Sequence, residues 1–347
     1  MISYKKILVL QTAFLGDVIL STPLIRALKQ LYPGSCLDVL TIPETGIIFK
    51  ENPHVDELIY FHKRSIFKKI CSFISLIFKI RQKKYDLAIS IQSSMTSSFL
   101  LLLGGVPERL GFTRQKFLTL SVQHTKGLHK IQKILRLMKP LTDQKFDMQT
   151  EIFWTEIEEE KSNRILEKYQ NKQRHIVGVA PGSIWNTKRW LKEYYAELVE
   201  LLEKENIQII LIGGKDDVEL CEFIRDDSSA LNVAGSLSIL ESAALIEKLD
   251  LLVTNDSAPL HIANAVKTDV IAIFGPTVKE FGFYPFREND KVIEVDLDCR
   301  PCGSHGGKKC PLEHHNCMKF ITAEMVFNEV NDHLQNRSEY SAIKENL

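Results

Sequence analysis

Short apolar runs alternate along this chain with amphipathic stretches that have the spacing of helices. The apolar runs predict buried strands at 6–11, 36–42, 57–61, 85–92, 175–182, 207–214, 251–257 and 270–276. The amphipathic stretches predict helices at 17–32, 65–84, 194–204, 241–249 and 259–266. Because strands that alternate with helices form parallel sheets through right-handed crossovers, the predicted fold class is α/β.

The pattern starts again after the polar stretch 158–174, which is typical of a helix leading into a linker. The length of 347 residues is enough for two domains of roughly 100–200 residues each. We therefore expect two doubly wound domains, 1–172 and 173–347, with a cleft between them.

The net charge argues against a nucleic-acid partner, and the hydropathy argues against a membrane-spanning helix. The 44 basic and 44 acidic residues cancel, so no overall positive field attracts nucleic acid. The longest uncharged apolar run, 70–78, is far shorter than the roughly 20 residues of a membrane-spanning helix. The sequence therefore predicts a soluble, cytoplasmic protein without a nucleic-acid partner.

Small or helix-capping residues follow the apolar strands of the second half directly, in four turns. These turns lie at 180–183, 213–217, 254–259 and 274–277. In parallel sheets, ligands sit at the carboxyl ends of strands, where helix N-termini offer free amides and a positive dipole end. Because the sequence has neither a Walker lysine motif nor a G-x-G-x-x-G fingerprint, the four turns together predict a different kind of nucleotide-binding face.

Three motifs resemble those of the ADP-heptose:lipopolysaccharide heptosyltransferases of glycosyltransferase family 9, particularly the heptosyltransferase II type. They are QTAFLGDVILSTPLIRAL at 11–28, APGSIWNTKRW at 180–190, and TNDSAPLHIANAV with AIFGPT between 254 and 277. The resemblance implies a GT-B architecture, with the acceptor on the N-terminal Rossmann-like domain and the nucleotide sugar on the C-terminal one. It also allows the terminal helix to pack back on the N-terminal domain.

The resemblance also implies the reaction. L-glycero-D-manno-heptose is transferred from ADP-heptose, with inversion, to the inner core of a lipid-anchored lipopolysaccharide, and catalysis requires no cofactor. Asp17 follows Gly16 at the first strand-to-helix turn and matches the family's general base, which removes the acceptor hydroxyl proton. The alternative is that Asp17 only complements the dipole at a helix N-terminus.

Donor contacts are carried over in the same way. Lys188 matches the family's phosphate-contacting lysine, where a cation offsets charge on the leaving diphosphate, and Arg189 is its local competitor for this role. Asp216 is expected to accept hydrogen bonds from ribose hydroxyls. Many relatives have Gly where this chain has Ala258, which predicts a less close approach of backbone to phosphate. The remaining donor contacts are assigned to Ser183, Asp256, Ser257 and Ala258. The N-terminus of the 257–266 helix is expected to contact the donor as well.

A cysteine cluster near the C-terminus raises a separate question. Four of the seven cysteines are spaced as a C-x-x-C pair followed by two more thiols: Cys299, Cys302, Cys310 and Cys317. This spacing predicts a structural zinc site that holds a glycine-rich segment together, without a role in catalysis. Free buried thiols are the alternative, whereas disulfides are disfavoured in a reducing cytoplasm.

The segment 65–84 is basic and apolar, and we expect it to be a helix packed on the N-terminal sheet. The same segment could contact the cytoplasmic face of the inner membrane. Its outward lysines would be Lys68, Lys69, Lys79, Lys83 and Lys84. Two other functions stay open: a GT-B transferase that uses another sugar nucleotide in cell-envelope glycan synthesis, and a non-catalytic nucleotide-sugar-binding protein.

Overall fold

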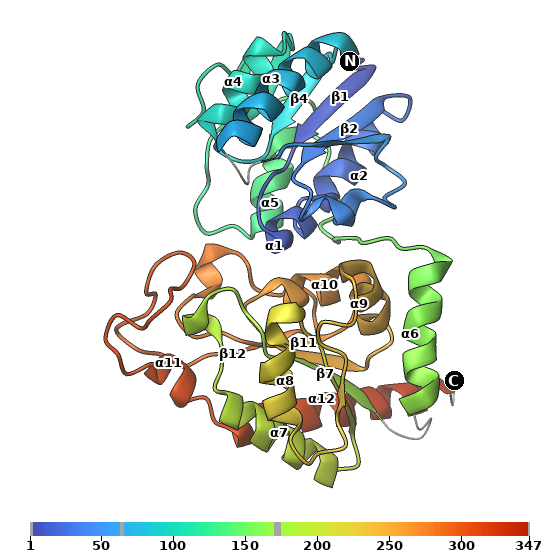
Figure 1. Cartoon of the computed structure of the whole chain (residues 1–347), viewed down its shortest axis with the longest axis vertical. Coiled ribbons are helices and arrows are strands. Elements are labelled where there is room, and N and C mark those ends of the chain that lie inside the picture. The colour runs from blue at the N-terminus through green and yellow to red at the C-terminus, as the bar shows by residue number, and fades with distance from the viewer. Residues whose placement is uncertain (1–2, 63–65, 170–174, 346–347) are drawn as a thin grey trace. The chain divides into compact units, whose positions relative to one another are not determined.

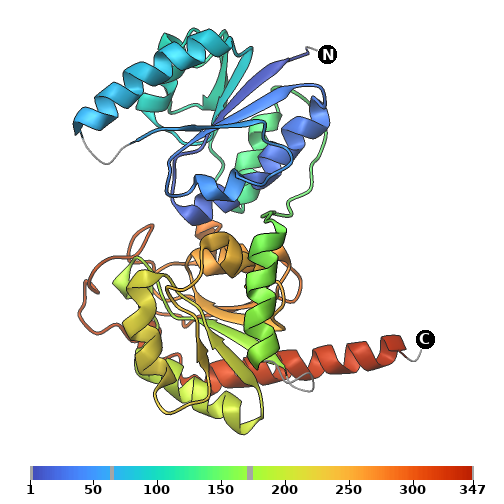
Figure 2. The same cartoon turned by 45° about the vertical axis from the view of Figure 1, so that its right-hand side comes forward.

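The computed structural model describes residues 3–62, 66–169 and 175–345. The chain divides into two compact units, Met1–Phe153 and Trp154–Leu347 (Figures 1 and 2). The division falls before helix α6 (Glu156–Tyr169), which packs against α9 of the second unit. The boundary that the sequence predicts, between 172 and 173, lies outside the described residues.

The first unit is a parallel sheet of six strands in the order β3-β2-β1-β4-β5-β6. Its strands are β1 (Lys6–Leu10), β2 (Cys36–Thr41), β3 (Glu57–Tyr60), β4 (Leu87–Ser90), β5 (Glu108–Phe112) and β6 (Leu120–Val122). The predicted strands at 6–11, 36–42, 57–61 and 85–92 are confirmed. The short strands β5 and β6 complete the sheet, and the sequence pattern does not predict them because neither is a strong apolar run.

Helices cover both faces of this sheet, with α3 and α4 on one face and α2 and α5 on the other (Figures 1 and 2). Their bounds are α1 (Leu15–Ile19), α2 (Thr22–Leu31), α3 (Ile66–Lys83), α4 (Met95–Leu103) and α5 (Lys130–Leu135). Short 3-10 turns follow β2 and α5, as η1 (Gly46–Phe49) and η2 (Arg136–Met138). The single helix predicted at 17–32 is wrong in one respect. Pro23 has no amide to continue a helix, so a second helix starts at Thr22.

The second unit repeats the same topology in the order β12-β11-β10-β7-β8-β9. Its strands are β7 (Ile176–Ala180), β8 (Gln208–Leu211), β9 (Leu231–Asn232), β10 (Leu251–Asn255), β11 (Val270–Ile273) and β12 (Lys291–Ile293). All described pairings are parallel. For example, Val253 of β10 lies opposite Val179 of β7 on one side and Ile271 of β11 on the other. Both units therefore have the Rossmann strand order, and the strand order reverses between β7 and β10 in the second.

Helices again lie on both faces, with α7, α8 and α12 on one and α6, α9 and α10 on the other (Figures 1 and 2). Their bounds are α7 (Lys192–Lys204), α8 (Val218–Arg225), α9 (Ile239–Ile246), α10 (Ala258–Val266), α11 (Asn316–Lys319) and α12 (Ala323–Glu345). The 3-10 turns are η3 (Asn186–Lys188), η4 (Lys215–Asp217) and η5 (Lys279–Phe281). The terminal helix α12 packs against α7 and β11 of its own unit.

Candidate functional site

Asn255, the last residue of β10, joins the turn after β7 to the middle of the second sheet. Its side chain is fully buried. The Asn255 amide donates to the carbonyl of Pro181 at 2.7 Å, and its oxygen accepts from the amide of Trp190 at 3.0 Å. Both ends of the 181–190 turn are thereby fixed at the point where the strand order reverses, which is where ligands bind in such sheets.

A buried ion pair lies at this point. The ammonium of Lys188 is 2.5 Å from Oδ2 of Asp256, and the two side chains are only 12% and 8% exposed. The hydroxyl of Thr277, after β11, donates to the same Oδ2 at 2.6 Å. Lys188, Asp256 and Thr277 therefore come from three turns. Thr277 orients the Asp256 carboxylate, and this carboxylate holds the Lys188 ammonium in a fixed position. Thr277 lies in the predicted 274–277 turn, but no sequence pattern assigns a role to its hydroxyl.

Helix α10 begins beside this ion pair. Ser257 is its N-cap residue and has extended backbone, but its side chain makes no capping hydrogen bond to the helix. The Ser257 hydroxyl lies 3.4 Å from that of Thr254 instead. The first amides of a helix have no intrahelical acceptor, and the dipole gives this end partial positive charge. Ala258 and the following turn therefore form an end that suits an anion.

The turn after β8 packs against the turn after β7. A Cβ atom on Gly182 would clash with the carboxylate of Asp217 unless that side chain moved. The Asp217 carboxylate also accepts from the amide of Gly214 at 3.0 Å. The predicted ribose contact, Asp216, is exposed in this turn, whereas Asp217 is the carboxylate that faces Gly182. Two successive glycines predict a turn, but they do not tell which aspartate turns inward.

Ser183 lies in the turn after β7, two residues beyond Pro181. Its hydroxyl accepts from the amide of Trp185 at 3.4 Å, and its carbonyl accepts from Nε of Arg189 at 2.7 Å. Arg189 therefore braces the turn that carries Lys188. The sequence suggests Arg189 only as a competitor of Lys188 for the phosphate role.

In the first unit, Asp17 lies in α1 with its side chain 25% exposed. Its Oδ1 is 3.1 Å from the ammonium of Lys130, at the start of α5. The side-chain amide of Gln11 donates to the Asp17 carbonyl at 3.0 Å, which ties the backbone of α1 to the residue that follows β1. Nothing in the sequence points to Lys130, because it is far from Asp17 along the chain.

Basic groups gather near Lys130. Burial lowers the pKa of His124, and the positive charges of Arg114, Lys130 and Lys133 lower it further. Burial and the charge of Lys130 also lower the pKa of Lys133. Positive charge therefore surrounds this part of the first unit, where an anionic group would be favoured.

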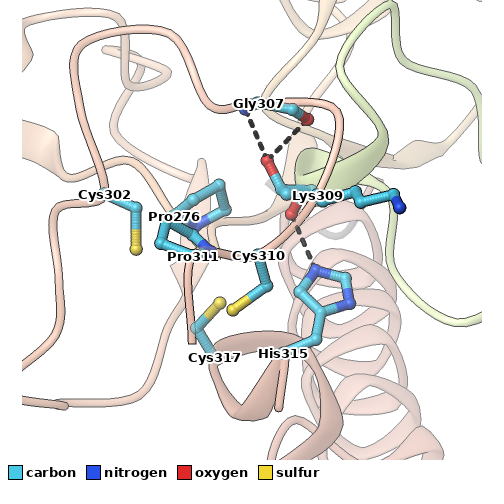
Figure 3. Close-up of a pocket in the computed structure, with 9 residues that line it drawn as sticks. Pro276, Cys302, Gly307, Lys309, Cys310, Pro311, His315 and Cys317 are labelled. Atoms are coloured by element: carbon cyan, nitrogen blue, oxygen red, sulfur yellow. Dashed lines mark hydrogen bonds between the residues drawn. The ribbon is translucent and has the colours of Figure 1, made fainter. Parts of the chain in front are cut away.

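The C-terminal cysteines are free thiols, and three of them line one pocket. Figure 3 shows Cys302, Cys310 and Cys317 around this cavity of about 60 Å³, with His315 at its edge. Burial is the main cause that raises the pKa of Cys302, and it raises the pKa of Cys317 to about 11. The sulfhydryl of Cys302 donates to the carbonyl of Cys299 at 3.1 Å.

The structure does not support the predicted zinc site. Within 3–62, 66–169 and 175–345, no group of three or more His, Cys, Asp or Glu side chains is arranged to hold a metal ion. Two of the polar groups around the pocket have other partners: the Cys302 thiol donates to the carbonyl of Cys299, and His315 Nε2 is hydrogen-bonded to the carbonyl of Thr187. Of the four cysteines, Cys317 is buried, whereas Cys299, Cys302 and Cys310 are partly exposed.

The basic, apolar segment forms α3, and its buried side packs on the first sheet as predicted. Leu76 and Ile80 join the core that includes residues of β1 and β4. Lys79 and Lys83 do not point freely outward, because both pair with Glu57. In the described residues, no helix has the length and apolarity needed to span a bilayer. Lys84 is exposed, whereas the side chains of Lys68 and Lys69 lie outside the described part of the chain.

Two parallel six-stranded sheets with the Rossmann strand order in one chain are the architecture of the GT-B class of glycosyltransferase folds. The sequence profile of glycosyltransferase family 9 (heptosyltransferase) matches residues 73–314. The chain belongs to this family and is a glycosyltransferase.

Curated relatives and solved structures agree with this assignment. The chain is 28% identical over 333 residues to lipooligosaccharide heptosyltransferase 2 of Campylobacter jejuni, covering 94% of this chain and 98% of that protein. It is 30% identical over 292 residues to lipopolysaccharide heptosyltransferase 3 of Escherichia coli, covering 79% and 83%. The structure of E. coli ADP-heptose lipopolysaccharide heptosyltransferase II superposes with a TM-score of 0.77 at 24% identity, covering 96% of this chain and 99% of that one.

Proposed function

We propose that this chain transfers L-glycero-D-manno-heptose from ADP-heptose to the inner core of lipopolysaccharide, with inversion at the anomeric carbon. The names of the relatives support the sugar and the acceptor, and the name of the E. coli enzyme of known structure supports the donor. Within the chain, the observation that carries the proposal is the buried Lys188–Asp256 pair at the start of α10.

The donor half of the reaction belongs to the second unit. Negative charge grows on ADP as the bond from its phosphate to the sugar breaks. Lys188 and the first amides of α10 offer positive charge before the reaction starts, so little reorganisation is needed in the transition state. Asp256 would itself repel a diphosphate, and we therefore give it the role of orienting Lys188.

Around this centre, Ser183 and Ser257 would contact the phosphates, and Ala258 would bring the helix amides to them. Asp216, which is exposed after β8, would accept from the ribose hydroxyls. This arrangement needs no metal ion and no cofactor for the transfer step, because a lysine and helix amides supply the positive charge.

The acceptor half belongs to the first unit. Asp17 would remove the proton from the acceptor hydroxyl as that oxygen attacks the anomeric carbon from the face opposite ADP. The ion pair with Lys130 holds the Asp17 carboxylate in one orientation. The basic groups near Lys130 would favour an acceptor with phosphate or carboxylate substituents.

A lipid-anchored acceptor requires the enzyme to work at a membrane surface. We propose peripheral contact with the cytoplasmic face of the inner membrane through α3 and α4. Ile70, Ile74 and Phe78 repeat at helical spacing along α3 and are 55%, 49% and 65% exposed. Met95 and Phe99 of the neighbouring α4 are also exposed. Such an apolar stripe suits the boundary between headgroups and acyl chains.

A donor screen tests the proposal against its alternatives. Purified protein is incubated with ADP-heptose, ADP-glucose, UDP-glucose and GDP-mannose, and bound and hydrolysed nucleotides are measured by mass spectrometry. Selective binding and slow hydrolysis of ADP-heptose support the proposal. Selection of another sugar nucleotide indicates a different transferase, and tight binding without turnover in the presence of acceptor indicates a non-catalytic binding protein.

A further inference from the structure

Thr187, the residue before Lys188, makes hydrogen bonds through its backbone and its hydroxyl to the cysteine-rich segment 299–317. Its amide donates to the carbonyl of Gly307 at 3.1 Å, and its hydroxyl accepts from the amide of Gly307 at 2.7 Å. Its carbonyl accepts from Nε2 of His315 at 2.9 Å (Figure 3). Thr187 is 5% exposed, so these contacts satisfy each polar group of a buried residue.

The same segment also approaches Lys188 itself. Gly306 has φ +77°, in the left-handed region, and a Cβ atom there would lie 3.1 Å from Cγ of Lys188 and from the hydroxyl of Thr187. Any other residue here would strain the backbone and push against these neighbours, so glycine favours the close approach of the segment. The lysine side chain is packed against backbone near its root, while its ammonium is held by Asp256 at its end.

The contact with His315 bears directly on Lys188. The carbonyl that His315 binds belongs to the peptide that joins Thr187 to Lys188, so the contact fixes the point from which the lysine side chain starts. A lysine has a long, flexible side chain, and holding its root and its end reduces the entropy lost when it binds an anion. Small displacements of a positioning group cost affinity and rate even when the charged group itself is unchanged.

We propose that the segment 299–317 positions Lys188 for the donor phosphates, with His315 as the positioning residue. This proposal rests on the donor site proposed above. It gives the cysteine-rich segment a role that does not depend on a bound metal: Thr187 and His315 line the same pocket as Cys302, Cys310 and Cys317, so the thiols lie beside the contacts that hold Thr187.

The test separates the His315 side chain from its backbone. His315 has φ +56°, a conformation that asparagine adopts more readily than most residues. In His315→Asn the amide ends one bond short of the Nε2 position, so the variant keeps the backbone preference and loses the contact with Thr187. In His315→Gln the amide reaches the Nε2 position and can still donate to that carbonyl.

A neighbouring histidine provides the matched control. His314 accepts from the amide of Asn316 through Nδ1 at 2.9 Å, and its hydrogen bond does not involve Thr187. His314→Asn keeps an oxygen near the Nδ1 position. This control should therefore bind ADP as the parent protein does.

Calorimetric titration with ADP, alongside melting curves, measures the effect. We expect His315→Asn to weaken ADP binding about three- to tenfold, the usual effect of one buried hydrogen bond. His315→Gln should stay within about twofold of the parent, even if its melting temperature falls. Unchanged affinity in folded His315→Asn, or equal losses in the Asn and Gln variants, would overturn the positioning role.

Two further variants keep the outcome decisive. Adding His315→Asn to Lys188→Ala should cause no further loss of ADP affinity, because the contact acts through Lys188. If Lys188→Ala binds ADP as tightly as the parent, the donor site itself is overturned. If Lys188→Ala loses ADP affinity and His315→Asn does not, only the role of His315 is overturned. If His315→Asn does not fold, Thr187→Val removes the hydroxyl contact with Gly307 and should show the same loss.

Discussion

Replacing Lys188 by methionine removes its charge while it keeps most of its length and packing. In the parent protein this ammonium is 2.5 Å from Asp256 Oδ2, and both side chains are almost buried. If Lys188 contacts the donor diphosphate, the variant loses a charge-assisted hydrogen bond, which is typically worth about 1.5–3 kcal/mol. That free energy corresponds to an ADP affinity lower by about 10- to 140-fold.

A second effect must be separated from this loss. Without the ammonium, the buried carboxylate of Asp256 keeps only the hydroxyl of Thr277 as a described side-chain donor. Breaking a buried pair in this way typically lowers the free energy of unfolding by about 3–5 kcal/mol, and the remaining Thr277 contact favours the lower end. The unpaired negative charge would also repel the phosphates, so weaker ADP binding alone is ambiguous.

The double variant Lys188→Met with Asp256→Asn resolves this ambiguity. It removes the unpaired charge, so the melting temperature should recover most of the loss. The affinity for ADP should stay well below that of the parent, because the cation is still missing. Calorimetric titration of ADP into the parent, the single variant and the double variant measures both effects. Parent-like ADP affinity in the double variant would refute a direct contact between Lys188 and the diphosphate.

Three other perturbations test the remaining parts of the proposal. Asp17→Asn should reduce the rate of heptose transfer by roughly 10²–10⁴ with ADP affinity nearly unchanged, as for a general base, and near-parent turnover would remove Asp17 from the mechanism. Phe78→Glu should reduce co-sedimentation with phosphatidylglycerol vesicles. The control Ile157→Glu, at a residue of α6 that is 76% exposed, should not reduce it. Equal co-sedimentation of the two variants would argue against docking through α3. Heptose transfer should persist in EDTA, since the proposed phosphate contacts are Lys188 and helix amides, and a loss of activity that a divalent cation restores would contradict this.

Sequence pattern was sufficient for the features set by local periodicity and capping. The run at 251–255 is apolar and is followed at once by short polar residues and Pro259, so it predicts a buried strand, a turn and a helix start. The structure has β10 and α10 at these positions. The alternation of strands with helices was likewise enough to predict two doubly wound sheets.

Contacts between distant segments could not be predicted in the same way. Lys130 reaches Asp17, and Gly307 reaches Thr187, only because the fold brings together segments that are far apart in the chain. No periodicity in one segment carries information about such pairing. The predicted zinc site shows the same limit: the C-x-x-C spacing gives the residue types of a ligand set but not the geometry of the four thiols in the fold.

The measurement that tests the central claim most directly is transfer by the purified protein. ADP-heptose and a panel of lipopolysaccharides truncated at successive sugars of the inner core are supplied, and the product is analysed by mass spectrometry and by NMR of its anomeric carbon. We predict that one heptosyl residue is added, with the anomeric configuration opposite to that in the donor, and that Asp17→Asn abolishes most of this signal. Transfer with retained configuration, or no transfer while another sugar nucleotide is used, would contradict the proposed reaction.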